Sequence, residues 1–249
     1  MYTNTCAIIL AAGKGKRLNS DKPKALHDLC GKPLISYILE HCDGLGIAPY
    51  IVIGHQGKLV QEALGGKYTY ALQKEQWGTG HAVLCALPVL PRHMTTVAVF
   101  NCDDSAFYRS ETIQRLLETH AQHKPNLTMI TVLQNDPTGL GRIIKNKKGE
   151  VIGIREERLA SPKEKLIKEI NTGAYVFDAA FLRSGLPRVE RNATGEYFIT
   201  DLVSFAANTE KGIAALTLEN SEEYVSVNTK EQLENARFLM QKNRIPART

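Results

Sequence analysis

The chain has 249 residues, 43% hydrophobic and 23% charged, which is enough for an ordinary globular core and unlike disordered or fibrous proteins. Its net charge of +5 is modest and no basic stripe is interleaved with aromatic residues, so nucleic acid is not an expected partner. No apolar run approaches the length of a membrane span, and Gly13 and Lys14 interrupt the first one before it could serve as a signal peptide.

The first half of the chain alternates buried strand-like runs with amphipathic stretches. Strands are expected at residues 6–11, 50–54, 68–72 and 96–101, and helices at 34–41, 57–64, 81–87 and 111–123. Alternation of this kind predicts an α/β fold in which a mostly parallel central sheet carries helices on both faces.

After Pro125 the pattern changes to short β-rich runs joined by turns. Strands are expected at residues 127–133, 142–145, 151–156 and 173–177, and helices at 196–207 and 230–241. Asn228 or Thr229 would cap the last helix. These runs extend the sheet and add a small antiparallel β excursion. Because no long linker interrupts the chain, we expect one domain over residues 1–241 and a polar tail at 242–249.

The cysteines give information about the compartment. Their number is odd, they are widely separated, and none forms a C-x-x-C pair (Cys6, Cys30, Cys42, Cys85 and Cys102). This pattern predicts reduced thiols in a cytoplasmic protein, neither a disulfide framework nor a zinc site.

A phosphate-binding loop is expected directly after the first strand. Small residues at 11–13 end the apolar run, and Lys14, Arg17 and Lys24 follow. Small residues let backbone N–H groups approach a phosphate, and the cations add positive charge there. The segment is not a P-loop, since no G-K-[ST] follows, and Leu18 replaces the third glycine of a dinucleotide fingerprint. We therefore favour a nucleoside triphosphate site over a solvated basic turn.

Two further segments fit a nucleotide and a metal. The Gly78-Thr79-Gly80 turn follows Gln73, whose amide could pair with a nucleobase edge, although the turn alone could be an ordinary helix cap. Asp103 and Asp104 follow the strand at 96–101, where open α/β sheets bind ligands. A carboxylate there suits Mg²⁺, and two adjacent residues allow one metal ligand and one helix cap.

Short polar segments mark the second half of the chain. They lie at residues 139–142, at Glu156, at 169–173 and at 195–201, between apolar runs. Glycine permits close backbone approach, while Asn, Glu and Thr supply both donors and acceptors. Each is commonplace alone, but together they suit a sugar with several hydroxyl groups.

In this order, the motifs resemble those of the sugar-phosphate nucleotidyltransferases, and most closely the uridylyltransferase domain of bacterial GlmU-type enzymes. The similarity covers about residues 6–233. It implies a Rossmann-like fold and Mg²⁺-dependent transfer from UTP to a sugar-1-phosphate, first of all N-acetylglucosamine-1-phosphate, in making nucleotide sugars for the cell envelope. Residues 1–124 would then bind the nucleotide and residues 125–229 the sugar phosphate.

The resemblance also implies individual roles. Arg17 and Lys24 would be the catalytic cations. The nucleotide would be bound by Leu10, Ala11, Ala12, Gly13, Gln73, Gly78 and Thr79, with Lys14 added from the charge argument. The sugar phosphate would be bound by Gly141, Glu156, Asn171 and Thr200. Asp103 and Asn228 would hold Mg²⁺, although counting back from Glu111 without a gap selects Asp104 in place of Asp103.

Three alternatives stay open. A Rossmann-type oxidoreductase needs an acidic residue at the end of the second strand, where this chain has Gly54-His55. A non-catalytic sugar-nucleotide sensor is compatible with the altered segment around Asp103. The same fold could also use another nucleotide or another sugar or alcohol phosphate, because Leu140 and Phe198 replace the family's usual tyrosines. The hexapeptide repeats of an acetyltransferase half do not occur, and no pattern indicates an oligomeric state.

Overall fold

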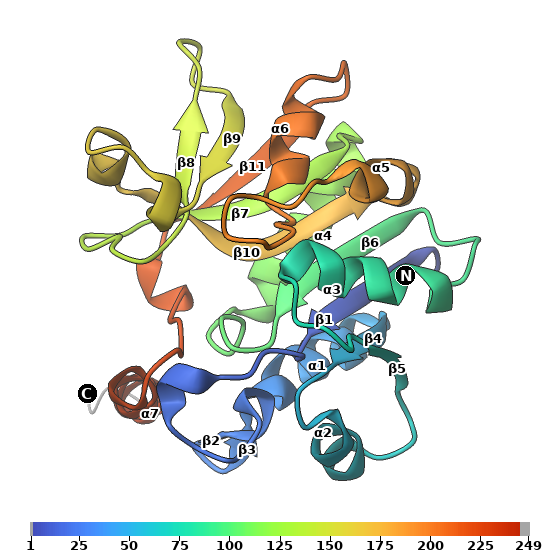
Figure 1. Cartoon of the computed structure of the whole chain (residues 1–249), viewed down its shortest axis with the longest axis vertical. Helices are drawn as coiled ribbons and strands as arrows, with labels where there is room; N and C mark the ends of the chain where they lie inside the picture. The colour runs from blue at the N-terminus through green and yellow to red at the C-terminus, as the bar shows by residue number, and fades with distance from the viewer. Residues whose placement is uncertain (1, 245–249) are drawn as a thin grey trace.

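The computed structural model describes residues 2–244 and is built around one central sheet (Figure 1). The strands along its main path follow the order β11-β7-β10-β6-β1-β4-β5. Their bounds in chain order are β1 (Thr5–Leu10), β4 (Ala48–Ile53), β5 (Thr69–Leu72), β6 (Thr96–Asn101), β7 (Leu127–Leu133), β10 (Glu169–Asp178) and β11 (Ile213–Leu218). All neighbours pair in parallel except β10, which is antiparallel to both β6 and β7. The predicted mostly parallel sheet is confirmed.

The predicted antiparallel excursion is also confirmed. β8 (Arg142–Lys145) and β9 (Val151–Arg155) form an antiparallel hairpin that joins the main sheet through β10. A separate antiparallel pair, β2 (Asp28–Leu29) and β3 (Lys32–Pro33), lies near the amino-terminal loop.

Helices cover both faces of the sheet, as predicted. They are α1 (Leu34–Leu45), α2 (Gly57–Leu64), α3 (Thr79–Ala86), α4 (Ser110–His123), α5 (Ala179–Gly185), α6 (Asp201–Ala207) and α7 (Lys230–Arg244). Alternate β1 residues point to opposite faces. Ile9 joins a core cluster with α1 and α4, whereas Ile8 joins one with α3, α5 and α6.

A third apolar cluster connects the two ends of the chain. Leu18 from the amino-terminal loop and Val227 from the segment before α7 pack in it with Leu233 and Ala236 of α7. In Figure 1, α7 lies beside β2 and the amino-terminal loop. This packing brings residue 228 close to the loop that follows β1.

The start of α7 resolves the choice of cap. The Thr229 hydroxyl accepts a hydrogen bond from the backbone N–H of Gln232 (3.2 Å). The side-chain oxygen of Gln232 in turn accepts one from the backbone N–H of Thr229 (3.1 Å). This reciprocal pair is a capping box. Because Thr229 is the cap, the Asn228 side chain takes no part in it. The helix extends past its predicted end to Arg244, and residues 245–249 of the predicted tail lie outside the described residues.

Several elements differ from the sequence predictions. α6 begins at Asp201 and not at Glu196, because residues 197–199 bond to the turn at 77–80. β10 begins at Glu169, four residues earlier than expected, and is interrupted by a bulge between Asn171 and Tyr175. β11 and α5 were not expected at all. None of the helices between residues 2 and 244 combines the length and apolar character that a membrane span requires.

We expect His120 to make stability fall with acidity. Its Nδ1 lies 2.9 Å from the Thr128 hydroxyl beneath α4, and burial lowers the pKa of the imidazole from 6.5 to about 4. Between these two values the unfolded chain binds a proton that the folded chain does not, so the free energy of unfolding decreases as pH falls from about 6.5 to 4. The loss should be about 3 kcal/mol.

Denaturant unfolding at several pH values measures this slope. His120→Gln should flatten it, even if it destabilises the protein at every pH. The exposed His123 on the same helix supplies the control, and His123→Gln should keep the wild-type slope. Equal slopes in wild type and His120→Gln would contradict the assignment.

Candidate functional site

Two adjoining cavities open where β1 and β6 end. Leu10 closes β1 and is paired in register with Asn101, which closes β6. The larger cavity has a volume of about 580 Å³ and the smaller about 230 Å³. Both are lined by Leu10, Thr79, Asn101, Asp104, Phe198 and Asn228. A crevice beyond the carboxyl ends of parallel strands is where open α/β sheets bind ligands.

The structure brings the predicted site residues together in two groups. The larger cavity is lined by all the predicted nucleotide, cation and metal residues: Leu10, Ala11, Ala12, Gly13, Lys14, Arg17, Lys24, Gln73, Gly78, Thr79, Asp103 and Asn228. The smaller cavity is lined by all the predicted sugar-phosphate residues: Gly141, Glu156, Asn171 and Thr200. Their assigned roles stay predictions.

The loop after β1 is anchored at both ends. The Ala11 amide donates to the carbonyl of Val52 (2.9 Å), which continues the pairing of β1 with β4. Leu18 is 1% exposed and its amide closes a short 3₁₀ turn on the carbonyl of Gly15. Between these anchors Gly13, Lys14 and Arg17 are exposed and line the larger cavity. The loop therefore presents backbone and cations together, as a polyphosphate requires.

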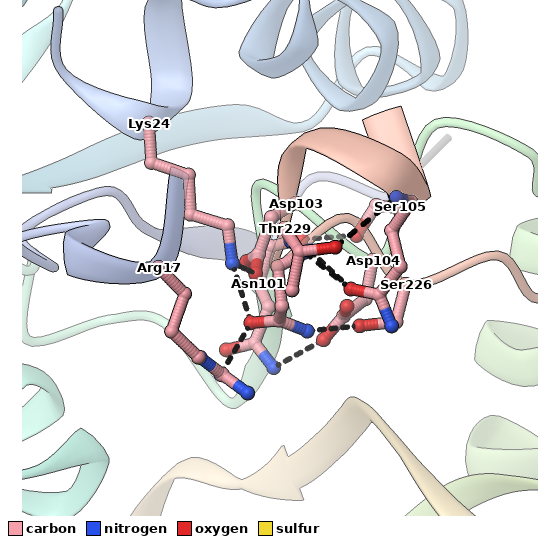
Figure 2. Close-up of polar contacts among 10 residues, drawn as sticks. Arg17, Lys24, Asn101, Asp103, Asp104, Ser105, Ser226 and Thr229 are labelled. Atoms are coloured by element: carbon pink, nitrogen blue, oxygen red, sulfur yellow. Dashed lines mark hydrogen bonds and ion pairs between the residues drawn. The ribbon is translucent and has the colours of Figure 1, made fainter. Parts of the chain in front are cut away.

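Residues from four separate segments meet at the back of this loop (Figure 2). The Lys24 ammonium forms an ion pair with Asp103 and donates to the Asn228 side-chain oxygen (2.8 Å). Arg17 donates to the same Asn228 oxygen (2.8 Å). Since Asp103 and Asn228 both contact one nitrogen atom, their oxygens lie within reach of a single cation. Burial opposes the charge on Lys24, but Asp103 and Asp104 outweigh it and raise its pKa.

The two adjacent carboxylates differ in surroundings. Asp103 faces Lys24, whereas Asp104 accepts a hydrogen bond from the Asn101 amide (3.2 Å) and lines both cavities. Burial, followed by the charge of Asp103, raises the pKa of Asp104 to about 7. This geometry favours Asp103 as the carboxylate that meets a cation.

A turn held by hydrogen bonds also lines the larger cavity. The Gln73 amide nitrogen donates to the carbonyl of Gly78 (3.0 Å) and lies 3.2 Å from Nδ1 of His81. The Tyr197 amide donates to the carbonyl of Trp77 (2.8 Å), and the Gly80 amide donates to the carbonyl of Tyr197 (2.8 Å). The turn at 77–80 is thus held by the Gln73 side chain and by backbone hydrogen bonds to the segment that precedes α6.

The smaller cavity is a polar pocket lined by β10, by the residues that flank the hairpin and by the segment before α6. Thr200 donates to a carboxylate oxygen of Glu156 (3.1 Å), and burial raises the pKa of Glu156. The backbone N–H of Asn171 donates to the carbonyl of Gly141 (2.8 Å). A Cβ on Gly141 would lie 2.9 Å from the Ile154 side chain, so the close approach depends on glycine. The pocket offers carboxylate, hydroxyl and amide groups on one surface.

Sequence reasoning missed two supporting residues. Asn101 donates to Asp104 and packs so closely on Gly173 (φ 78°) that a side chain there would overlap it. Ser226 accepts a hydrogen bond from the Asn228 amide group (2.5 Å) and so orients the Asn228 oxygen toward the cations. A signal for Ser226 was present, because a serine hydroxyl two residues from Asn228 can accept a hydrogen bond from its side chain.

Comparisons with known proteins identify the family. A family model described as nucleotidyl transferase matches residues 6–224. The bifunctional protein GlmU of Heliobacterium modesticaldum is 40% identical over 237 residues, covering 94% of this chain and 52% of that protein. GlmU of Exiguobacterium sibiricum is 42% identical over 241 residues, covering 96% and 54%. The chain thus spans about half the length of these curated relatives.

A solved structure shows the same fold. It is a putative glucose-1-phosphate thymidylyltransferase from Bacillus anthracis in complex with a sucrose. The TM-score is 0.77 and 94% of each chain is covered, at 22% sequence identity. The Rossmann-like architecture implied by the sequence is therefore shown.

Gly78→Ala should destabilise the turn at 77–80. Gly78 has a φ of 98°, and an added Cβ would lie 2.5 Å from the Tyr197 carbonyl oxygen. Gly195 has a similar φ of 81° but nothing within 4 Å of an added Cβ, so Gly195→Ala measures the cost of the backbone conformation alone. We expect Gly78→Ala to lose about 1–3 kcal/mol more than Gly195→Ala in denaturant unfolding, because of the overlap. Equal losses would contradict the packing described.

Proposed function

The chain belongs to the nucleotidyl transferase family, and we propose that it couples UTP to a sugar-1-phosphate and releases pyrophosphate. The observation that carries the proposal is the place of Asn228, which lines both cavities and accepts a hydrogen bond from Lys24, the partner of Asp103 in the larger cavity. N-acetylglucosamine-1-phosphate is the first candidate, since the relatives named above are GlmU proteins. A cytoplasmic location is part of the proposal.

The reaction needs charge neutralisation more than proton transfer. A phosphate oxygen of the sugar-1-phosphate attacks the α-phosphorus of UTP, and the bond to the bridging oxygen breaks, so that pyrophosphate leaves with the electron pair. The nucleophile is already anionic at neutral pH, because a phosphate monoester has a second pKa near about 6. The obstacle is repulsion between two polyanions. Lys14, Arg17 and Lys24 line the larger cavity and oppose that repulsion.

No side chain has to act as a general base. His81 lies next to the turn that is expected to bind the nucleobase. Its Nδ1 lies 3.2 Å from the Gln73 side chain and its Nε2 lies 3.7 Å from the Cys85 sulfur. These contacts fit a structural role. Positioning of the two phosphates in line would supply much of the remaining acceleration.

Both substrates find suitable groups in their cavities. The Gln73 amide nitrogen donates within its turn, which leaves its carbonyl oxygen to accept from the N3–H of a uracil ring. Glu156, Asn171 and Thr200 can exchange hydrogen bonds with sugar hydroxyl and amide groups. We therefore assign the base to the larger cavity and the sugar to the smaller one.

The donor set also fits Mg²⁺. This ion keeps several waters and takes phosphate oxygens, so it needs only one or two oxygens from the protein. Asp103 supplies a charged oxygen and Asn228 a neutral one, and both already contact the Lys24 ammonium. Mg²⁺ bound by these residues would neutralise phosphate charge between the two cavities.

Turnover is the direct test. Pyrophosphate release should be measured over a panel of nucleoside triphosphates and sugar or alcohol phosphates, with Mg²⁺ or with a chelator. We expect release with UTP and a hexose-1-phosphate, greatest with N-acetylglucosamine-1-phosphate, and none with the chelator. A folded protein that binds UTP but releases no pyrophosphate with any pair would support the sensor hypothesis instead.

The carboxylate assignment has a matched test. Asp103→Asn removes the charge that meets the cations, whereas Asp104→Asn alters a residue bonded to Asn101. We expect Asp103→Asn to lower kcat on the order of a hundredfold and to raise the Mg²⁺ concentration needed for half-maximal rate. Asp104→Asn should change that concentration far less. The reverse order would move the metal to Asp104.

A further inference from the structure

A stack of side chains lies just outside both cavities. The guanidinium carbon of Arg191 is 4.1 Å from the centre of the Trp77 ring and 5.3 Å from that of Tyr197. Trp77 also lies against His81, with ring centres 5.0 Å apart. Neither Trp77 nor Arg191 lines a cavity described above. We call Trp77, Arg191 and Tyr197 the outer stack.

The outer stack covers a junction between two segments of backbone. Tyr197 exchanges backbone hydrogen bonds with both sides of the turn at 77–80 (2.8 Å each). The Ile199 amide donates to the Thr79 hydroxyl (3.2 Å). Gly78 packs so closely on Tyr197 that no side chain fits between them. The two segments therefore keep their spacing only while this junction is closed.

Both joined segments contribute to both proposed substrate sites. The turn places Gln76 and Gly78 in the larger cavity and Thr79 in both cavities. The segment before α6 places Glu196 in the larger cavity, Thr200 in the smaller, and Phe198 in both. An opening of the junction would displace groups from the two cavities at once.

Arg191 is well placed to hold the junction. It precedes a short loop that is bonded to itself, since the Asn192 side-chain oxygen accepts from the amides of Thr194 (2.8 Å) and Glu196 (3.3 Å). Among the ion pairs formed within residues 2–244, none includes Arg191. Its ring contacts thus join this loop to Trp77, through the attraction of a cation to an aromatic face.

We propose that Arg191 is a positioning residue, which stacks on Trp77 to keep the turn at 77–80 closed against the segment before α6 and so sets the affinity for both substrates. This inference rests on the proposed function. The free protein already orders both segments, so that less conformational freedom is lost when a substrate binds. Arg191 touches no reacting atom in this proposal, and chemistry after binding should be unaffected.

The experiment compares two arginines that stack on aromatic rings. Arg191→Ala is the test, and Arg188→Ala, which removes an exposed guanidinium 5.4 Å from the Phe205 ring, is the matched control. We expect Arg191→Ala to raise KM for UTP and for the sugar phosphate about two- to fivefold, the range for an exposed cation–aromatic contact. Its kcat should stay within twofold of wild type, and Arg188→Ala should change neither KM.

Two further variants separate stacking from folding. Trp77→Leu should raise both KM values as Arg191→Ala does, and the double variant should be no worse than either single one, because one contact is lost in all three. Arg191→Lys should restore part of the affinity, since it keeps the charge but not the planar stack. A purely structural role would instead lower the unfolding temperature and kcat while leaving both KM values unchanged, and that result would overturn the proposal.

Calorimetric titration with UTP keeps the inference distinct from the proposed function. If the wild type binds UTP but turns over no substrate pair, the proposed function fails, while weaker UTP binding by Arg191→Ala than by Arg188→Ala still supports a positioning role. If wild type and Arg191→Ala bind UTP equally, the positioning role is overturned whatever the turnover.

Discussion

The parallel pairing of β1 with β6 is the constraint on which the site depends. It fixes Leu10 beside Asn101, so the cation-rich loop after β1 and the two carboxylates after β6 leave the sheet at the same edge. Lys24 and Asp103 are 79 positions apart in the sequence, and this register is what brings them into contact. Buried strands hold the register firmly, because a slip of one residue would turn Ile8 and Ile9 to the wrong cores.

Electrostatics then explains how the charged groups at this edge are held together. Two adjacent carboxylates repel one another, and the Lys24 ammonium between Asp103 and Asn228 offsets that repulsion. The same ammonium contacts the two oxygens that we propose as ligands of Mg²⁺.

Sequence patterns predicted the features that depend on residues close together in the chain. The apolar run, the small residues and the cations after β1 lie within about twenty positions, so the loop could be recognised without any tertiary information. The pairing of Asn228 with Asp103 is different, since it depends on the apolar cluster that docks α7 against Leu18, and only the family resemblance suggested it. The start of α6 was wrong for a related reason. Helix-compatible residues at 196–200 bond instead to a turn more than a hundred positions earlier, and no local propensity reports such a contact.

The segment before α6, where the helix prediction was wrong, contributes residues to both proposed substrate sites. If helix α6 began at Glu196, the Tyr197 carbonyl would accept its hydrogen bond from the Asp201 amide within the helix and would not be directed at the Gly80 amide. The extended segment gives up about one helical turn and in return forms a wall shared by both cavities. Two anionic substrates must approach within bonding distance while their charges oppose it, so a shared wall is a direct way to fix their separation. The irregular segment before α6 is therefore a condition of the proposed chemistry and not a defect in the helix.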